Sequence, residues 1–500
     1  SSPSFSPSTA VDGLNGFSFL APTNWLLIEG DTFNFLGNNI ENGEGGSSPI
    51  QYNITIRRNV IENAYNQLEV HTEGLFTSDV GNLTVEDNVF DHGGWNGTLI
   101  QPMPVTISVA SPAVVTIGTN YLANNEPITF TTTGSLPTGL IIGTVYCVMN
   151  YATTTFNVYD DGGNCAGDST AIDASGSQSG TQDVIWQGPQ PDEYNRNNYL
   201  DNGGSSSTVF NDNIDAEGAS GGVQMREGGT TENNLFLQDP ISITYGNNES
   251  SVTQTVGGTI ADNVILDAED IGTTTDSGYQ PQGEGIGVYS YYAGDGFAAN
   301  LIDGLNIYDN LIAHQVQGTG NIYGLVLGSG GAPFTDTDVH NNVIYDWGNG
   351  LSASGATGFY ISIPTSGSSG NTFEDNQIQM PNGATIGSTD GTSGGSITLS
   401  DNSYYSANPT NQWFYDNTSY VSTSTWNTEM GDTGATYTPV SYTDNTRDIQ
   451  TYDSEVLGGP GTFADFMAGA DAQSYEDWNP AYTPEVVNDW MRAGYGLPQI

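Results

Sequence analysis

The chain has 500 residues, of which 57 are acidic and only 6 are basic, so its formal net charge is −51. Every basic residue is an arginine, because the sequence contains no lysine. Binding to nucleic acid or to an anionic membrane surface needs clustered lysine and arginine, so this composition excludes both kinds of partner. Charged residues make up 13% of the chain, about half the usual share, so the imbalance comes from missing cations.

An acidic exterior would explain the missing lysine. At a pH well below the carboxylate pKa of about 4, an ordinary protein carries dozens of uncompensated cations, whereas this chain carries few. A lineage bias in amino-acid usage is the alternative. We therefore expect an extracellular or cell-surface protein. If an acidic exterior explains the missing lysine, this protein works in an acidic environment. No apolar stretch is long enough for a membrane span, and no signal peptide is recognisable.

The first segment, residues 1–19, reads as an N-terminal arm. Its start is rich in serine and proline, and tails of this composition are ordered mainly when they dock on another surface. We therefore expect the arm to engage a neighbouring copy of the chain.

From residue 20 a short motif recurs, in which polar residues precede an asparagine and an apolar run follows it. The first three asparagines of the motif are 20 and 29 residues apart, a period typical of one coil of a solenoid. Short apolar stretches between Gly, Asn, Asp and Ser predict strands, and stacked Val, Ile, Leu and Phe would fill the interior.

The repeated asparagine has a structural explanation. At a sharp turn it tolerates the left-handed backbone region, and its amide can bond to the same residue one coil away. The motif recurs more weakly at Asn376 and Asn402. The predicted ladder consists of Asn39, Asn59, Asn88, Asn213, Asn234, Asn263, Asn310 and Asn342.

An insertion interrupts the repeat and separates a first solenoid part, residues 20–102, from a second, residues 187–430. In residues 103–186, apolar and polar residues alternate in a pattern typical of an independent β-sandwich. Their stretches 134–140 and 176–181 resemble a small module of phage-tail and bacterial surface proteins. Cys147 and Cys165 predict a disulfide, and hence an oxidising compartment, although two buried thiols are the alternative.

The pattern changes again after residue 430. Residues 462–468 and 484–492 predict short helices, the second of which opens with Pro484. We assign residues 431–500 to a cap region, in which a helix over the last coil would cover its exposed strand ends.

The Asn-Asn-Val-Ile pattern resembles the right-handed parallel β-helix, or pectate-lyase-like, superfamily over about residues 20–430 apart from the insertion. Residues 90–96, 224–229 and 487–494 resemble a group of secreted bacterial β-helix repeat proteins. The resemblance implies an all-β fold, a right-handed parallel β-helix with an inserted small β-sandwich-like domain and a short helical C-terminal cap. Members of that group usually carry further N-terminal coils, so we expect an open sheet end.

Enzymes of this superfamily act on polysaccharides along a groove of the β-helix. Its lyases usually need a Lys or Arg base, and the elements of its polygalacturonase-like hydrolases are absent from the helix. Carboxylates of adjacent coils could still act as acid and base, and histidine titrates near neutral pH. The candidate catalytic residues around the insertion are His71, Glu73, Asp91, His92, Asp215, Glu217 and Arg226.

Two further kinds of site follow from residue types. The acidic residues three or four places after the asparagines would form a column that can bind calcium. The alternative is a turn whose acidic side chains are merely solvated. These residues are Glu62, Asp91, Asp201, Asp267 and Asp346. No cofactor is required. Sequons mark candidate glycosylation acceptors at Asn53, Asn82, Asn96, Asn248 and Asn417.

The sequence lacks lysine and the catalytic residue sets of the β-helix lyases and hydrolases, which favours a secreted, non-catalytic structural or surface protein. It would be the β-helix subunit of an extracellular filament, fibre or adhesin, and it would self-associate into a homo-oligomer or filament. The alternative is a polysaccharide-degrading enzyme, either a lyase or glycoside hydrolase or a phage tailspike-like depolymerase, with polysaccharide as its partner.

Overall fold

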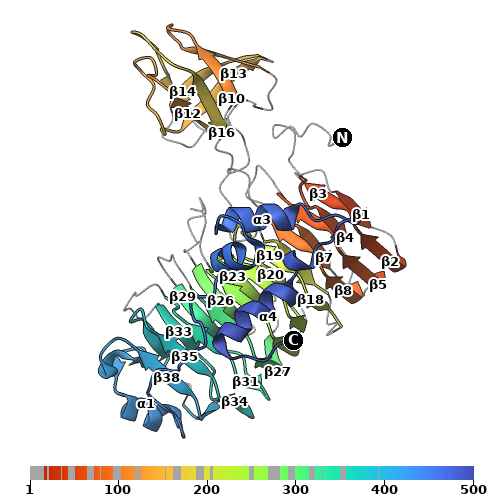
Figure 1. The fold of residues 1–500 in the computed structure, drawn as a ribbon, viewed down its shortest axis with the longest axis vertical. Helices are drawn as coiled ribbons and strands as arrows, with labels where there is room; N and C mark the ends of the chain where they lie inside the picture. Colours follow the sequence, from red (N-terminus) through yellow and green to blue (C-terminus); the bar gives the residue numbers. More distant parts are fainter. Residues whose placement is uncertain are drawn as a thin grey trace.

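The computed structural model describes residues 16–19, 22–34, 36–42, 51–64, 72–78, 80–93, 103–118, 122, 124, 127–152, 154–160, 170–186, 196–202, 207–246, 253–268, 282–290, 299–314, 321–328, 330–348, 356–391 and 394–500. Three long sheets run along this part of the chain (Figure 1). Their strands pair in parallel with the equivalent strands of the next coil, except for the antiparallel β39–β40 hairpin that ends the first sheet.

The strands of the three sheets follow one another in a fixed order. The first sheet contains β1 (Phe17–Phe19), β4 (Ile40–Asn42), β7 (Leu75–Ser78), β17 (Asn198–Asp201), β20 (Val223–Met225), β23 (Ile241–Gly246), β26 (Gln282–Tyr289), β29 (Asn321–Leu327), β33 (Ala356–Ile361), β36 (Thr385–Thr389), β39 (Phe414–Tyr415) and β40 (Tyr420–Val421). The second contains β2 (Thr23–Glu29), β5 (Gln51–Arg57), β8 (Val80–Glu86), β18 (Val209–Asn211), β21 (Gly228–Glu232), β24 (Gln254–Ala261), β27 (Asn300–Tyr308), β31 (Asp338–His340), β34 (Asn371–Glu374) and β37 (Ile397–Ser400), with β30 (Phe334–Thr335) beside β27. The third contains β3 (Thr32–Asn34), β6 (Val60–Glu62), β9 (Val89–Asp91), β19 (Ile214–Ala216), β22 (Leu235–Leu237), β25 (Val264–Leu266), β28 (Leu311–Ala313), β32 (Val343–Tyr345), β35 (Gln377–Met380) and β38 (Ser403–Ser406).

These pairings confirm the predicted right-handed parallel β-helix, the handedness that parallel crossovers favour. Its interior is apolar and stacked, as the rings of Phe90, Phe210 and Phe236 show, with centroids 6.0 and 6.3 Å apart in successive coils. Burying each such side chain contributes about 1.5–3 kcal/mol. β1 starts the first sheet at Phe17, within the segment assigned to the arm; residues 1–15 lie outside the described residues.

The asparagine ladder forms, with a change of membership. From Asn59 to Asn402, each Asn Nδ2 donates to the Oδ1 of the ladder asparagine in the next coil, at 2.8–3.2 Å. Asn376 and Asn402 are part of it. Asn39 is not, because it precedes β4 of the first sheet and donates instead to the Glu62 carbonyl at 2.9 Å. In the first coil the ladder position is held by Asp31, whose amide donates to Asn59 Oδ1 at 3.0 Å.

The left-handed backbone falls one residue earlier than the ladder asparagine, which corrects the prediction. The residues directly before the ladder asparagines have φ of 52–59°; they are Arg58, Asp87, Asp212, Asn233, Asp262, Asp309, Asn341, Asp375 and Asp401. They make the turn between the second and third sheets, and this turn aims the following asparagine side chain into the interior. Asp and Asn tolerate this conformation better than other side chains.

The predicted small inserted β domain forms, and its sheet is a closed antiparallel barrel. Its strands are β10 (Met103–Ile107), β11 (Val114–Ile117), β12 (Pro127–Thr132), β13 (Tyr146–Ala152), β14 (Thr155–Asp160), β15 (Thr170–Ala171) and β16 (Gln182–Trp186). β11 pairs with both β10 and β14, which closes one sheet on itself around its own core. Cys147 is buried in β13, whereas Cys165 lies outside the described residues, so their pairing stays a prediction.

The last coil is closed by α1 (Thr423–Met430), which follows η2 (Thr410–Gln412) and the β39–β40 hairpin. Ser422 caps its N-terminus by accepting from the Thr425 amide, and Gly431 ends it with φ 68°. The fully buried Trp426 stacks on Phe414 with ring centroids 4.4 Å apart. The last coil is therefore covered by a helix that was not predicted, since α1 ends just before the assigned cap region, residues 431–500.

The predicted helices at 462–468 and 484–492 form as well, but they do not cover the last coil. The elements after α1 are α2 (Ile449–Tyr452), η3 (Asp453–Leu457), α3 (Phe463–Asp471), η4 (Pro480–Tyr482) and α4 (Pro484–Tyr495). α2, α3 and α4 pack on the outer face of the third sheet, and Figure 1 shows α3 and α4 along the side of the β-helix. That face is apolar through coil after coil, and Val89, Ile214, Leu235, Val264, Leu311 and Val343 would otherwise be exposed. No helix in the described ranges is long and apolar enough to cross a membrane.

Candidate functional site

The predicted catalytic residues do not form one site. Asp91, His92 and Glu217 lie at the edge of the third sheet, beside α3. Asp215 points into the interior, and Glu73 and Arg226 flank the first sheet. His71 lies outside the described residues.

His92 and Glu217 occupy the same corner position in successive coils. The His92 amide donates to the Ala216 carbonyl at 3.2 Å, and both residues have positive φ, 53° and 50°. Their side chains therefore stack one coil apart. His92 Nδ1 lies 2.8 Å from Asp91 Oδ1, and His92 Nε2 lies 3.2 Å from Glu217 Oε2.

Two more carboxylates complete this group, which we call the His92 cluster: Glu62, Asp91, His92, Glu217 and Asp471. Burial acts to lower the pKa of His92, but Asp91, Glu217 and Asp471 outweigh it and raise that pKa to about 9. Burial, followed by the charge of Asp91, raises the pKa of Glu62 to about 7 and that of Asp471 to about 9.

The His92 cluster is poorly placed for catalysis on a polymer. The Asp91 and His92 side chains are only 8% and 14% exposed. Asp471 is the last residue of α3, and α3 contacts β9 directly. A polysaccharide chain therefore could not lie across this site while α3 is docked, whereas ion pairing or cation binding needs no such access.

Asp215 lies in the interior, in register with Phe90 and Phe236. Its carboxylate accepts from Asn197 Nδ2 at 2.5 Å and from Asn198 Nδ2 at 2.8 Å. Burial raises the pKa of Asp215 to about 7, although both amides act to lower it. Since the side chain is fully buried, Asp215 is a structural residue that substrate cannot reach.

Glu73 and Arg226 flank Tyr199, on the outer face of β17 in the first sheet. The Tyr199 ring stacks on Phe76 with centroids 5.4 Å apart, and the Arg226 guanidinium lies 4.7 Å from the Tyr199 centroid. Glu73 and Tyr199 are both buried, and burial raises the pKa of Tyr199 to about 12. Arg226 thus stacks on an aromatic ring of its own chain.

Two polar groups on the outer face of the first sheet are not among the residues predicted from the sequence. Arg196 Nη1 donates to Gln224 Oε1 at 2.8 Å, and the buried Glu284 accepts from the Tyr289 hydroxyl. Burial raises the pKa of Glu284 to about 7. Gln224 alternates with the inward-facing Val223 and Met225 of β20, a period-two pattern that could have revealed it.

Other predicted sites are dispersed. Of the five acidic residues predicted to form one column, only Glu62 and Asp91 are in register. Asp267 and Asp346 lie one residue later in their coils, and Asp201 lies in the first sheet. The prediction of a single acidic column is therefore wrong.

Three of the glycosylation candidates are described. Asn82 Nδ2 donates to Asn53 Oδ1 at 3.0 Å, Asn53 Nδ2 to Asn24 Oδ1 at 2.7 Å, and Asn417 Nδ2 to the Asp390 carbonyl at 3.1 Å. A glycan would attach to these same nitrogens. Asn96 and Asn248 lie outside the described residues.

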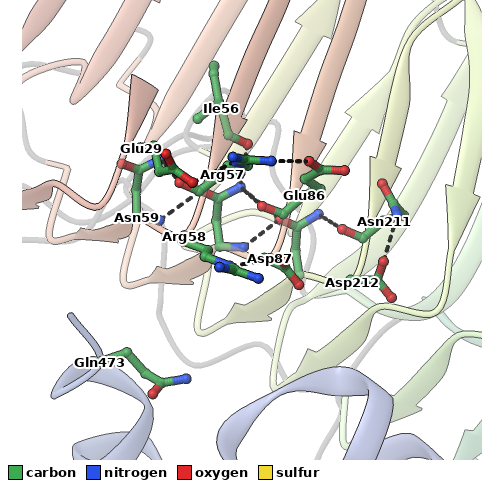
Figure 2. Close-up of polar contacts among 12 residues, drawn as sticks. Glu29, Ile56, Arg57, Arg58, Asn59, Glu86, Asp87, Asn211, Asp212 and Gln473 are labelled. Atoms are coloured by element: carbon green, nitrogen blue, oxygen red, sulfur yellow. Dashed lines mark hydrogen bonds and ion pairs between the residues drawn. The ribbon is translucent and has the colours of Figure 1, made fainter. Parts of the chain in front are cut away.

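Arginines near the first coils contact carboxylates of neighbouring coils. Figure 2 shows Arg57 between Glu29 and Glu86, with N–O distances of 2.7 and 3.8 Å, and Arg58 beside Asp87 at 3.4 Å. These scarce cations therefore offset rows of stacked acids, which accounts for their positions without a substrate.

Comparisons with known proteins add little to this picture. No protein-family model matches the sequence, and no curated protein matches it. Among solved structures, the chain is similar to the tailspike protein gp49 from Pseudomonas phage LKA1, with 10% sequence identity and a TM-score of 0.18. The match covers 78% of this chain and 55% of the tailspike, so the chain spans about half the length of that protein. A TM-score this low supports no inference about activity.

Proposed function

We propose that this chain is a non-catalytic structural subunit of an extracellular surface assembly. The observation that supports this proposal is the separation of the predicted catalytic groups. Asp215 is enclosed in the core, the His92 cluster lies beside a docked helix, and Arg226 stacks on Tyr199. A glycoside hydrolase needs two carboxylates on opposite sides of one accessible sugar. None of the three places in the described part of the chain offers this arrangement.

The two ends of the β-helix differ, which bears on how such a subunit would assemble. α1 and the β39–β40 hairpin close the last coil. In the first coil β1, β2 and β3 each pair on one side only, as far as the described residues extend. Trp25 and Leu27 of β2 are 80% and 50% exposed there, and Trp25 adopts φ 66°, a strained value for a bulky side chain.

Exposed apolar groups on an open sheet edge favour pairing with other strands. We therefore propose that copies associate through their first coils, with the N-terminal arm contributing. Because the last coil is closed, simple head-to-tail stacking of coils would not extend a filament. Extension would need a second contact, and the inserted barrel is the available module.

The absence of catalysis can be tested with acidic and neutral polysaccharides at pH 3–7. We expect neither new reducing ends nor absorbance from an unsaturated product. If products form and the Arg226→Ala variant loses them while Arg58→Ala keeps them, the proposal is wrong and the lyase alternative is correct.

The association can be tested by mass photometry over a concentration series. We expect the full chain to form oligomers, and both Trp25→Ser and deletion of residues 1–12 to shift the population to monomers. Val456→Ser is the control, because Val456 of η3 is 46% exposed and lies outside both the first coil and the inserted barrel. Association that is unchanged in Trp25→Ser would exclude the first coil as the contact.

A further inference from the structure

A hydrogen-bonded loop of the inserted barrel holds two isoleucines in solvent. Residues 133–145 connect β12 to β13, and within them Ile141 and Ile142 are 65% and 58% exposed. The Ile141 amide donates to the Tyr146 hydroxyl at 3.0 Å, and the loop exchanges two backbone hydrogen bonds of 2.9 Å with Ser175. The loop is therefore held in place while these two apolar side chains stay outside the core.

No other part of the described chain covers these isoleucines. Val109, on the loop between β10 and β11, is the other large hydrophobic residue exposed in the described part of the barrel, at 50%. The barrel forms a lobe of its own beside the three long sheets (Figure 1). Adjacent aliphatic side chains on such a lobe are a candidate contact surface, because burying them against another apolar surface is favourable.

The charge distribution indicates which partner suits this surface. Between His92 and Asp160 the chain has a single charged residue, Glu126, although its net charge is −51. Two copies of so acidic a chain repel each other wherever their carboxylates meet. They can approach through the loop of residues 133–145 with little repulsion, whereas a basic partner would be attracted to other parts of the surface.

We propose that the barrel is a self-association module, in which residues 133–145 pack Ile141 and Ile142 against the same loop of a second copy. A contact between two identical surfaces is twofold symmetric and closes after two copies. It bears on assembly only together with the proposed function, on which this step rests. Copies joined alternately through their first coils and through their barrels would form an open chain.

The barrel contact is weak on its own. The loop is shorter than the about 20–30 residues that each partner contributes to a stable interface. We therefore expect dimers only above a concentration of about 10 µM. The dilute solutions used for mass photometry would not populate them.

Sedimentation velocity of the full chain carrying Trp25→Ser isolates this contact, because that variant removes the proposed first-coil contact. Over about 1–200 µM we expect a reversible monomer–dimer equilibrium. Adding Ile141→Ser or Ile142→Ser should weaken the dimer by at least about tenfold, since each substitution removes an apolar side chain from both copies. Val456→Ser, a matched change of an exposed aliphatic residue in η3, should leave it unchanged.

The Trp25→Ser background separates this test from the proposed first-coil contact. Monomers at every concentration would overturn the barrel contact and leave the first-coil contact standing. Dimers that persist in both isoleucine variants would overturn the assigned surface. If Trp25→Ser abolishes dimers and Ile142→Ser alone weakens association of the otherwise unchanged chain, the loop binds the first coil of another copy, and the twofold contact is wrong.

Discussion

The ladder asparagine is the residue on which the stacking of coils depends. Asn263 illustrates its hydrogen bonding. Its Nδ2 donates to Asn310 Oδ1 and to the Thr231 carbonyl, both at 2.9 Å, and its Oδ1 accepts from Asn234 Nδ2 at 2.9 Å and from the Asn234 amide at 3.0 Å. An aspartate could not donate and a leucine could neither donate nor accept, so only an amide satisfies both neighbouring coils.

Replacing a ladder residue should therefore be costly. We expect Asn263→Ala to lower the free energy of unfolding by about 2–4 kcal/mol, because it removes hydrogen bonds and leaves buried partners unpaired. Asn306→Ala in the adjacent coil is the matched control, since Asn306 Oδ1 has no hydrogen-bond partner among the described residues. Guanidinium unfolding of both variants measures the difference. Equal effects would show that the ladder contributes nothing special.

The residue before the ladder position should tolerate Asn and Gly but not a β-branched side chain. Asp375 is exposed and has φ 55°. Asp375→Asn should unfold at the wild-type denaturant midpoint, whereas Asp375→Val should cost about 1–2 kcal/mol in unfolding free energy. A neutral valine substitution would refute the assigned backbone role.

Periodicity alone predicted most of the ladder, but not which residue makes the turn. Asp-Asn and Asn-Asn pairs contain two residues that both tolerate the left-handed region, so composition does not separate them. Asn39 was misassigned because the first coil uses Gly30 and Asp31 in place of the usual pair, with Gly30 at φ 74°.

At the scale of elements, α4 is matched to the spacing of the coils. Glu485 lies near Asp87 and Asp212, Asn488 Nδ2 donates to Asn233 Oδ1 at 3.0 Å, and Arg492 Nη2 lies 2.7 Å from Asp262 Oδ1. Three or four helical residues rise about 5 Å, close to the strand spacing of about 4.8 Å. Each turn of α4 therefore meets the next coil.

Arg492 should be the residue that anchors this helix. Its side chain is fully buried, and besides Asp262 it donates to the carbonyls of Asp309 and Pro498. We expect Arg492→Met to destabilise the docked segment by about 3–5 kcal/mol, because it leaves acceptors buried without a donor. Hydrogen exchange in α4 and on β22, β25 and β28 should rise.

The control for this variant is Arg58→Met. The Arg58 side chain is 50% exposed in its ion pair with Asp87, so its loss should cost less than about 1 kcal/mol. Unchanged exchange in Arg492→Met would contradict the assigned anchor.

The helices could be predicted from the sequence, and their location was partly encoded there too. In Asn59-Val60-Ile61 the isoleucine faces the interior and the valine faces outward, and both are buried. Two consecutive apolar residues open β6, β9, β22, β25, β28 and β32, which indicates that both faces of the third sheet are covered in these coils. Which segment covers the outer face could not be predicted from this pattern, because the covering helices lie hundreds of residues away in the sequence and reach the sheet only in the tertiary structure.

At the scale of the whole molecule, buried carboxyl groups make the fold more stable at acidic pH than at neutral pH. Burial raises the pKa of Glu284 to about 7 and those of Asp212 and Asp432 to about 6. Their stabilising effect is complete below the unfolded-state pKa near 4 and is lost as the pH rises through 6 and 7. Stability should therefore be greatest near pH 4 and should decline towards pH 8.

Glu284→Gln tests this dependence. The variant cannot ionise, so at pH 8 it should be more stable than the wild type by up to about 3 kcal/mol, and near pH 4 it should be equal. Denaturant unfolding at both pH values gives the comparison, with the exposed Glu455→Gln as control. Wild-type stability that rises from pH 4 to pH 8 would contradict the assigned titration.

The central claim is that this protein is a structural subunit that associates through its first coil. Electron microscopy of the purified full chain, at pH 4 and at pH 7, tests it most directly. The account predicts rods that meet at the first-coil end, each with the inserted barrel as a separate lobe. Single dispersed rods at both pH values and at every concentration would contradict it.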